Sequence, residues 1–212
     1  MKKHLLHVVI WVVALFSFNS SKAQYVTIPD TNFVIYLQDT FPNCMQGNQM
    51  DITCPDIIQA QSLYCSDANI HDITGIEYFP NVVFLDCSGN HIDTIYNLPP
   101  NLATLQCAGQ NTGQTSFSIL NIPPSLIWLD CSSNNFDGHS VPPVPNTLQY
   151  LNISNAYNEY IHLPDSLQVL IDSASLTSYI SGNAPNLWYM NIGYNDLGDS
   201  GSFNSGFFDN LH

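Results

Sequence analysis

Histidine, serine, cysteine and aspartate are the residue types in this chain that could carry chemistry, and their spacing decides which chemistry is open to them. Four histidines, His71, His91, His139 and His162, share no spacing typical of metal ligands, so we expect them to be surface side chains. No serine stands in a G-x-S-x-G motif or in another nucleophile motif. The sequence therefore predicts no metal site, no cofactor and no enzymatic activity.

The chain is strongly acidic and almost without cations. Its formal net charge is -14, and its only cationic side chains apart from histidine are Lys2, Lys3 and Lys22. Nucleic acids and anionic membranes are bound through clusters of Lys and Arg. Both classes of partner are therefore excluded.

All three lysines lie in a segment with the features of a secretory signal peptide. Lys2 and Lys3 form a positive start, residues 5–18 are mostly apolar, and Ser21 and Ala23 are the small residues of a cleavage site. The apolar run is too short to be a comfortable membrane span. We expect a mature protein that is secreted or displayed at the cell surface, where disulfides persist. Without Lys or Arg it would have no salt bridges and would rest on apolar burial and backbone hydrogen bonds.

A sequence repeat fills most of the remaining chain. Its best copies are residues 85–90 (LDCSGN), 105–110 (LQCAGQ) and 129–134 (LDCSSN). Weaker copies begin at Leu63, Leu151, Leu170 and Met190. The steps between copies are 19 to 24 residues long, a period typical of solenoids, in which each coil buries its apolar edge against its neighbours.

The repeat resembles the leucine-rich repeat, L-x-x-L-x-L-x-x-N, over about two thirds of the chain. The resemblance implies a leucine-rich repeat solenoid with a parallel β-sheet on its concave face, and it is closest in character to secreted bacterial members of the family. Along each short strand, side chains alternate, so Leu85 and Cys87 would point inward and Asp86 outward. His71 and His91 fall at different offsets of their coils, so we expect that they do not stack.

The bends and the convex side of the coils are expected to differ along the chain. The Asn position of the repeat would bind backbone groups in each bend, and its replacement by Ala156 and Ser175 predicts looser fifth and sixth coils. Proline pairs at 99–100 and 123–124 are typical of the Leu-Pro repeat type and predict an extended or polyproline-like convex side. The first repeat, 70–79, resembles the internalin-like type, which implies a short helical turn.

The segment before the repeats resembles the amino-terminal cap of secreted bacterial leucine-rich repeat proteins. Pro29 or Asp30 suits the start of a short helix that runs to Gln38. Its apolar residues would cover the first coil; they are Phe33, Tyr36 and Leu37.

The six cysteines fall into two classes. Cys44 and Cys54 lie outside the repeat and flank a polar loop, so we predict a disulfide between them. The others occupy the third, inward position of their strands, where we expect buried free thiols that pack as small apolar groups. These are Cys65, Cys87, Cys107 and Cys131.

The outward strand positions would give the concave face aromatic and acidic or amide side chains. The predicted ligand-binding residues are Tyr64, Phe84, Asp86, Trp128, Asp130, Tyr150, Asn152, Trp188, Tyr189 and Asn191. Clustered exposed aromatics are typical of binding surfaces. We predict a protein or peptide ligand, preferably a basic one; the alternatives are a glycan-binding adhesin that uses the same face and a structural segment of a larger surface protein.

The expected organisation is therefore a single solenoid with short additions at its ends. Residues 1–23 would form the signal peptide and 24–59 the cap, followed by about seven leucine-rich repeats over 60–197. Residues 198–212 would form a carboxyl-terminal tail or cap.

Overall fold

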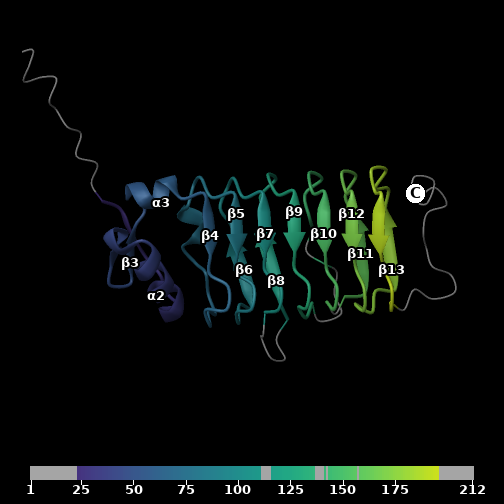
Figure 1. The fold of residues 1–212 in the computed structure, drawn as a ribbon, viewed down its shortest axis with the longest axis horizontal. Coiled ribbons are helices and arrows are strands. Elements are labelled where there is room, and N and C mark those ends of the chain that lie inside the picture. The colour runs from purple at the N-terminus through teal and green to yellow at the C-terminus, as the bar shows by residue number, and fades with distance from the viewer. Residues whose placement is uncertain (1–22, 111–115, 137–140, 142, 157, 196–212) are drawn as a thin grey trace, which may run out of the picture.

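The computed structural model describes residues 23–110, 116–136, 141, 143–156 and 158–195 as a parallel β-solenoid with a small amino-terminal cap (Figure 1). Most of the predicted signal peptide, all of the predicted tail 198–212, and His139 lie outside these residues. The fold class is the predicted leucine-rich repeat solenoid. No helix among the described residues is long and apolar enough to cross a membrane.

One strand from each coil enters a single parallel sheet, and the spatial order of the strands follows the chain. The seven strands are β4 (Ser62–Tyr64), β5 (Phe84–Asp86), β7 (Thr104–Gln106), β9 (Trp128–Asp130), β10 (Tyr150–Asn152), β12 (Val169–Ile171) and β14 (Tyr189–Asn191). Neighbouring strands pair in one constant register, so that the central residue of each strand lies beside the central residue of the next. This register aligns equivalent positions of the repeat into columns that run along the solenoid.

The inward columns form the core. The central leucines from Leu63 to Leu170 are at most 1% exposed, and the four repeat cysteines form a second buried column beside them. Burial of one such leucine contributes about 1.5–3 kcal/mol. No single coil could bury its leucine alone, so the sheet depends on the stacking of coils.

A ladder of buried amides joins consecutive coils at the bends that follow the strands. The Asn90 Nδ2 donates to the carbonyls of Cys65 and Cys87, both at 2.8 Å, while its Oδ1 accepts from two backbone N–H groups of the preceding bend. Asn134 bonds in the same way to the carbonyls of Cys107 and Cys131. Gln110 occupies the equivalent position one coil earlier, where its Nε2 donates to the carbonyls of Cys87 and Cys107. Each amide therefore satisfies backbone groups that would otherwise be buried without partners.

In the fifth and sixth coils, where Ala156 and Ser175 replace the ladder amide, several polar side chains are buried in the interior. The Ser175 hydroxyl donates to the carbonyl of Ile153 at 2.7 Å. Asn158 donates to the hydroxyl of Thr177 at 2.8 Å, and both side chains are buried. Asp172 takes the place that cysteine has in earlier coils and is fully buried. That these coils are looser stays a prediction.

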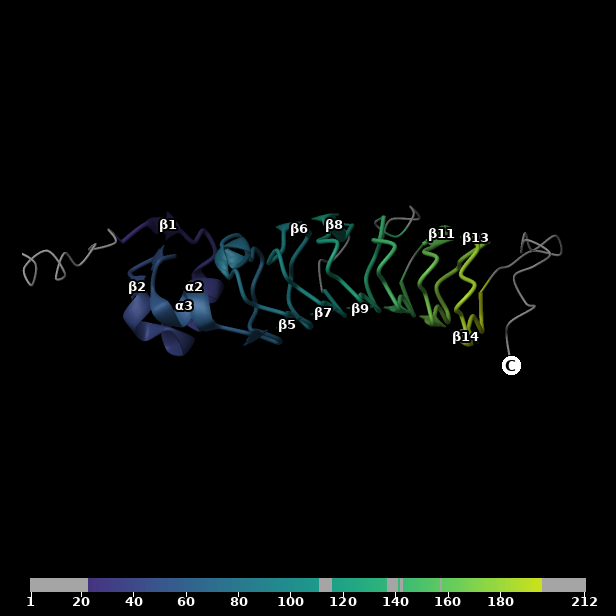
Figure 2. The same ribbon diagram turned by 90° about the horizontal axis from the view of Figure 1, so that it is seen from above.

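The convex side is extended, as predicted, but it also forms short parallel ladders of its own. The first coil contains the expected helical turn, the 3-10 helix η2 (Ile76–Tyr78). Farther along, β6 (Thr94–Asn97) pairs with β8 (Ser118–Asn121), and β11 (Tyr160–Leu163) pairs with β13 (Tyr179–Gly182). Figure 2 shows these strands in a row opposite the seven-stranded sheet.

The cap is built from two α-helices, a 3-10 helix and a three-stranded antiparallel sheet. Its elements are β1 (Tyr25–Thr27), α2 (Thr31–Thr40), η1 (Pro42–Cys44), β2 (Met45–Gln46), β3 (Gln49–Asp51) and α3 (Pro55–Gln59). Helix α2 begins where predicted, because the Asp30 Oδ1 accepts the Phe33 N–H at 2.8 Å. The predicted polar loop between Cys44 and Cys54 is the β2–β3 hairpin, with Gly47 at positive φ in its turn.

The cap also covers the open edge of the first coil. Phe33 and Leu37 of α2 are fully buried. The Tyr36 hydroxyl accepts the backbone N–H of Tyr64 in β4 at 3.1 Å. A strand edge that would otherwise be free to pair with another chain is thus covered.

Candidate binding surface

The outward strand positions form one continuous concave face, and the strand register sets which of them are neighbours. Of the predicted binding residues, Tyr64 is 64% exposed, Trp188 is 59% exposed and Tyr189 is 44% exposed. The others are only partly buried; they are Phe84, Asp86, Trp128, Asp130, Tyr150, Asn152 and Asn191. The core does not require any of these aromatics, since the central leucine of each strand already fills the interior.

The aromatic side chains meet in pairs rather than standing alone. Tyr64 and Phe84 lie with ring centroids 5.1 Å apart and planes inclined by 37°. Trp188 and Tyr189 meet edge to face at 6.0 Å. These pairs lie at the two ends of the sheet.

The middle of the sheet carries the closest pair. Trp128 and Tyr150 are direct partners in the β9–β10 register, and their rings are nearly parallel with centroids 4.4 Å apart. Partial burial raises the pKa of Tyr150, and the nearby Asp130 raises it further. Because the two rings face each other, each shields one face of its partner from solvent.

The polar residues of the face have a structural role that the sequence analysis missed. Each accepts the backbone N–H two positions later and so closes the bend after its strand. The acceptor oxygens belong to Asp86, Asp130, Asn152 and Asn191, at 3.0–3.2 Å. The sequence does contain a signal for these bonds. An Asp or Asn at the end of each of these strands is followed two residues later by Ser or Gly, as in Asp86-Cys87-Ser88.

The carboxylates of Asp86 and Asp130 differ in whether their second oxygen also accepts a hydrogen bond. The second oxygen of Asp130, Oδ2, accepts from the Asn152 amide at 3.0 Å, so both of its oxygens are bound. The Oδ2 of Asp86 has no hydrogen bond to another described residue. Asp86 is therefore the carboxylate of the pair that can still accept a donor from a ligand.

The cysteines divide into the two predicted classes. Cys44 and Cys54 form a disulfide with Cα atoms 5.6 Å apart, which closes the β2–β3 hairpin. The four repeat cysteines are free and buried. Burial raises the pKa of the Cys65 thiol to about 12, and the thiols of the other three are also shifted upward. Such thiols are poor nucleophiles and metal ligands at neutral pH.

The prediction that His71 and His91 do not stack was wrong. Their ring centroids are 5.1 Å apart and their planes differ by 24°. In the first bend Asp67 and Asn69 have positive φ, and the His91 N–H donates to the Ile70 carbonyl at 2.8 Å. This backbone bond aligns the two histidines despite their different offsets.

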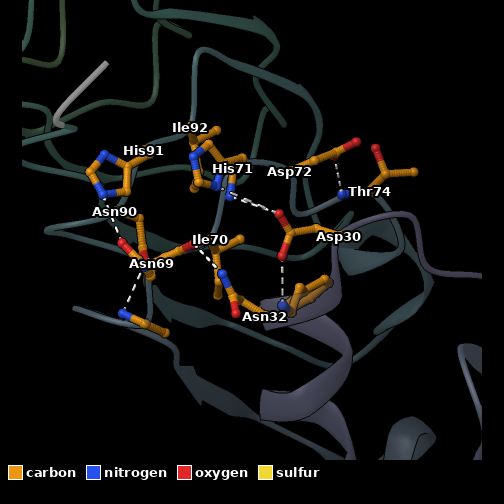
Figure 3. A network of polar contacts seen from close by, with 12 residues as sticks. Asp30, Asn32, Asn69, Ile70, His71, Asp72, Thr74, Asn90, His91 and Ile92 are labelled. Atoms are coloured by element: carbon orange, nitrogen blue, oxygen red, sulfur yellow. Dashed lines mark hydrogen bonds and ion pairs between the residues drawn. The ribbon is translucent and has the colours of Figure 1, made fainter. Parts of the chain in front are cut away.

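The same cluster joins the cap to the first coil (Figure 3). The Asp30 Oδ2 accepts the backbone N–H of His71 at 2.9 Å and lies 3.9 Å from its ring Nδ1. The amide of Asn32 donates to the Asn69 carbonyl at 2.6 Å. When His71 is protonated it forms an ion pair with Asp30, so the expectation of a fold without salt bridges was also wrong at this place.

Comparison with known proteins adds little to this description. No protein-family model and no curated protein matches the chain. Nineteen chains of solved structures match it; one is YopM from Yersinia enterocolitica WA-314, with 24% sequence identity and a TM-score of 0.36. That match covers 54% of this chain and 29% of YopM. The fold assignment rests instead on the repeat, the constant strand register and the amide ladder.

Proposed function

We propose that this chain is an exported binding module that holds a protein partner against its concave sheet. The observation that carries the proposal is the set of partly exposed aromatic pairs on a face where the core does not need them. Aromatic residues dominate the energetics of protein interfaces, because they bury a large area at a small cost in side-chain entropy. Leucine-rich repeat solenoids are typically scaffolds for such surfaces rather than enzymes.

The charge of the chain favours a basic partner. Beyond Lys22 the sequence contains neither Lys nor Arg, while acidic residues continue throughout. A surface of one sign steers partners of the opposite sign toward it and disfavours partners of the same sign. Export is supported by the signal-peptide features of residues 1–23, and the Cys44–Cys54 disulfide is typical of an oxidising compartment.

A glycan-binding adhesin is the second candidate, and Trp188 is the observation that favours it. This indole is 59% exposed and meets Tyr189 by an edge, which leaves ring surface for a sugar to stack on. In the middle of the sheet, however, Trp128 and Tyr150 turn their faces toward each other. The polar groups beside them, Asp130 and Asn152, are bound to each other and to the bends, which leaves few donors and acceptors for sugar hydroxyls. A protein ligand is therefore favoured.

The test is a binding screen of residues 24–212 against arrayed extracellular proteins and glycans. Trp128→Ala with Tyr150→Ala should abolish binding to the ligand found. The matched control is Tyr160→Ala with Tyr179→Ala, which removes a similar stacked pair, with centroids 5.3 Å apart, from the convex side. Circular dichroism must show that both variants are folded. Binding that survives the concave change, or is lost equally in both variants, would contradict the proposal.

A further inference from the structure

The first two strands of the concave sheet place an aromatic pair beside a carboxylate. In the β4–β5 register Tyr64 is the direct partner of Asp86, and Phe84 lies on the same face two residues before Asp86. The Tyr64 and Phe84 ring centroids are 5.1 Å apart, and Tyr64 is among the most exposed aromatics of the face. Because paired strands are about 4.8 Å apart, one ligand group can touch both the rings and the carboxylate.

The carboxylate of this group, Asp86, has no cationic partner in the part of the chain that the structure describes. Its Oδ1 accepts the Ser88 N–H at 3.0 Å, but its Oδ2 has no hydrogen bond to another described residue. No Lys or Arg exists beyond residue 22 to neutralise it. Residues 23–212 therefore offer it no fixed cationic side chain, and a partner molecule can supply one.

We infer that Tyr64, Phe84 and Asp86 form a subsite for an arginine side chain of the protein partner, an inference that rests on the proposed function. A guanidinium is planar, so it stacks on an aromatic face while its N–H groups donate to a carboxylate in the same contact. A cation is attracted by a ring whose centroid is within about 6 Å, and the separation of these two rings lets one guanidinium reach both. A lysine offers a point charge with no flat surface, so it fits this geometry less well.

The second carboxylate of the face does not repeat the arrangement. Asp130 has both oxygens bound, and the neighbouring rings of Trp128 and Tyr150 are stacked on each other. Asp130 thus provides a control with the same charge, in the same column of the sheet, but without the open geometry. Any effect that is only a long-range field should be similar at both positions.

The test uses a blocked peptide of four Gly-Ser-Arg repeats, with its lysine and citrulline counterparts, in titration calorimetry against residues 24–212. The arginine peptide should bind more tightly than the lysine peptide, and the neutral citrulline peptide should bind least. Asp86→Asn keeps an acceptor for Ser88 but removes the charge, so it should weaken binding of the arginine peptide about tenfold or more. Tyr64→Leu should also weaken it, whereas Asp130→Asn should change it by less than about twofold.

Two results would overturn the subsite: equal losses in Asp86→Asn and Asp130→Asn, or arginine binding no better than citrulline. Failure of the broader proposal looks different. If the ligand from the array screen is lost in the Trp128/Tyr150 variant but retained in Asp86→Asn, the subsite is wrong and the concave-face function stands. If that ligand survives the Trp128/Tyr150 change while the peptide still needs Asp86, the proposed function is wrong as stated.

Discussion

Replacement of the buried carboxyl of Asp172 should stabilise the protein at neutral pH. Asp172 is fully buried where earlier coils have cysteine, and its Oδ1 has no hydrogen-bond partner among the described residues. Burial raises the pKa of Asp172 from 3.8 to about 6, although the nearby hydroxyls of Thr177 and Ser175 partly lower it. The ionised form is therefore disfavoured in the folded chain, and Asp172→Asn removes that cost.

The sign and size of the effect follow from the pKa. Because the pKa of the folded state lies above that of the unfolded state, folding binds the proton more tightly, and the stabilisation is fully present below about pH 4. It is lost as the pH rises through about 6 and stays lost above that. A pKa difference of this size corresponds to about 3 kcal/mol. Each kcal/mol should raise Tm by about 2–4 °C in a chain of this length.

The assay is thermal unfolding, followed by circular dichroism, of the wild type, Asp172→Asn and the control Asp165→Asn between pH 4 and pH 7.5. Asp165 is an exposed aspartate in the same coil. Asp172→Asn should be more stable than the wild type at pH 7.5, and the difference should shrink toward zero at pH 4. The reasoning is refuted if Asp172→Asn gains nothing at pH 7.5, if its gain is equal at pH 4, or if Asp165→Asn behaves identically.

Three further predictions concern the amide ladder, the cysteines and the cap. In denaturant titrations, Asn90→Ala should lower the free energy of unfolding by about 2–4 kcal/mol, because it leaves buried backbone groups unpaired. The control Asn101→Ala, at an exposed position, should lower it by less than about 1 kcal/mol, and equal losses would contradict the ladder's role. The denatured, unreduced mature chain should give four free thiols in a thiol assay, and a count of zero or six would disprove the assignment. Asp30→Ala should lower the free energy of unfolding by about 1–2 kcal/mol, because helix α2 loses its N-cap, whereas Asp30→Asn should retain most of the wild-type stability. If the free energy of unfolding of Asp30→Ala equals that of the wild type, the cap is dispensable.

The sheet and its core were predictable because they repeat. Aligning the repeat copies predicts the columns through Leu85, Cys87 and Asn90, because the strands pair in one constant register and equivalent positions become neighbours. The helix start at Asp30 and the Cys44–Cys54 disulfide follow from local signals of residue type and position.

What was missed depends on departures from the repeat or on bonds between coils. The His71–His91 stack joins two positions at different offsets of their coils, and a backbone hydrogen bond between the coils, which the sequence does not display, sets its alignment. Asp130 was predicted to meet a ligand, yet both of its oxygens bind the chain itself. Periodicity places an outward residue on the concave face, but it does not show how many of that residue's hydrogen bonds are already made.

The constant register has a consequence for how this surface could change in evolution. Coil lengths vary from 19 to 24 residues, yet every strand enters the sheet in phase, so the bends and the convex side absorb all of the variation. A substitution in one outward column therefore leaves the spacing of the other columns intact. Duplication of one coil would lengthen the concave face by about 4.8 Å without disturbing the contacts already in place. The binding surface can thus be altered residue by residue or extended coil by coil while the scaffold stays the same.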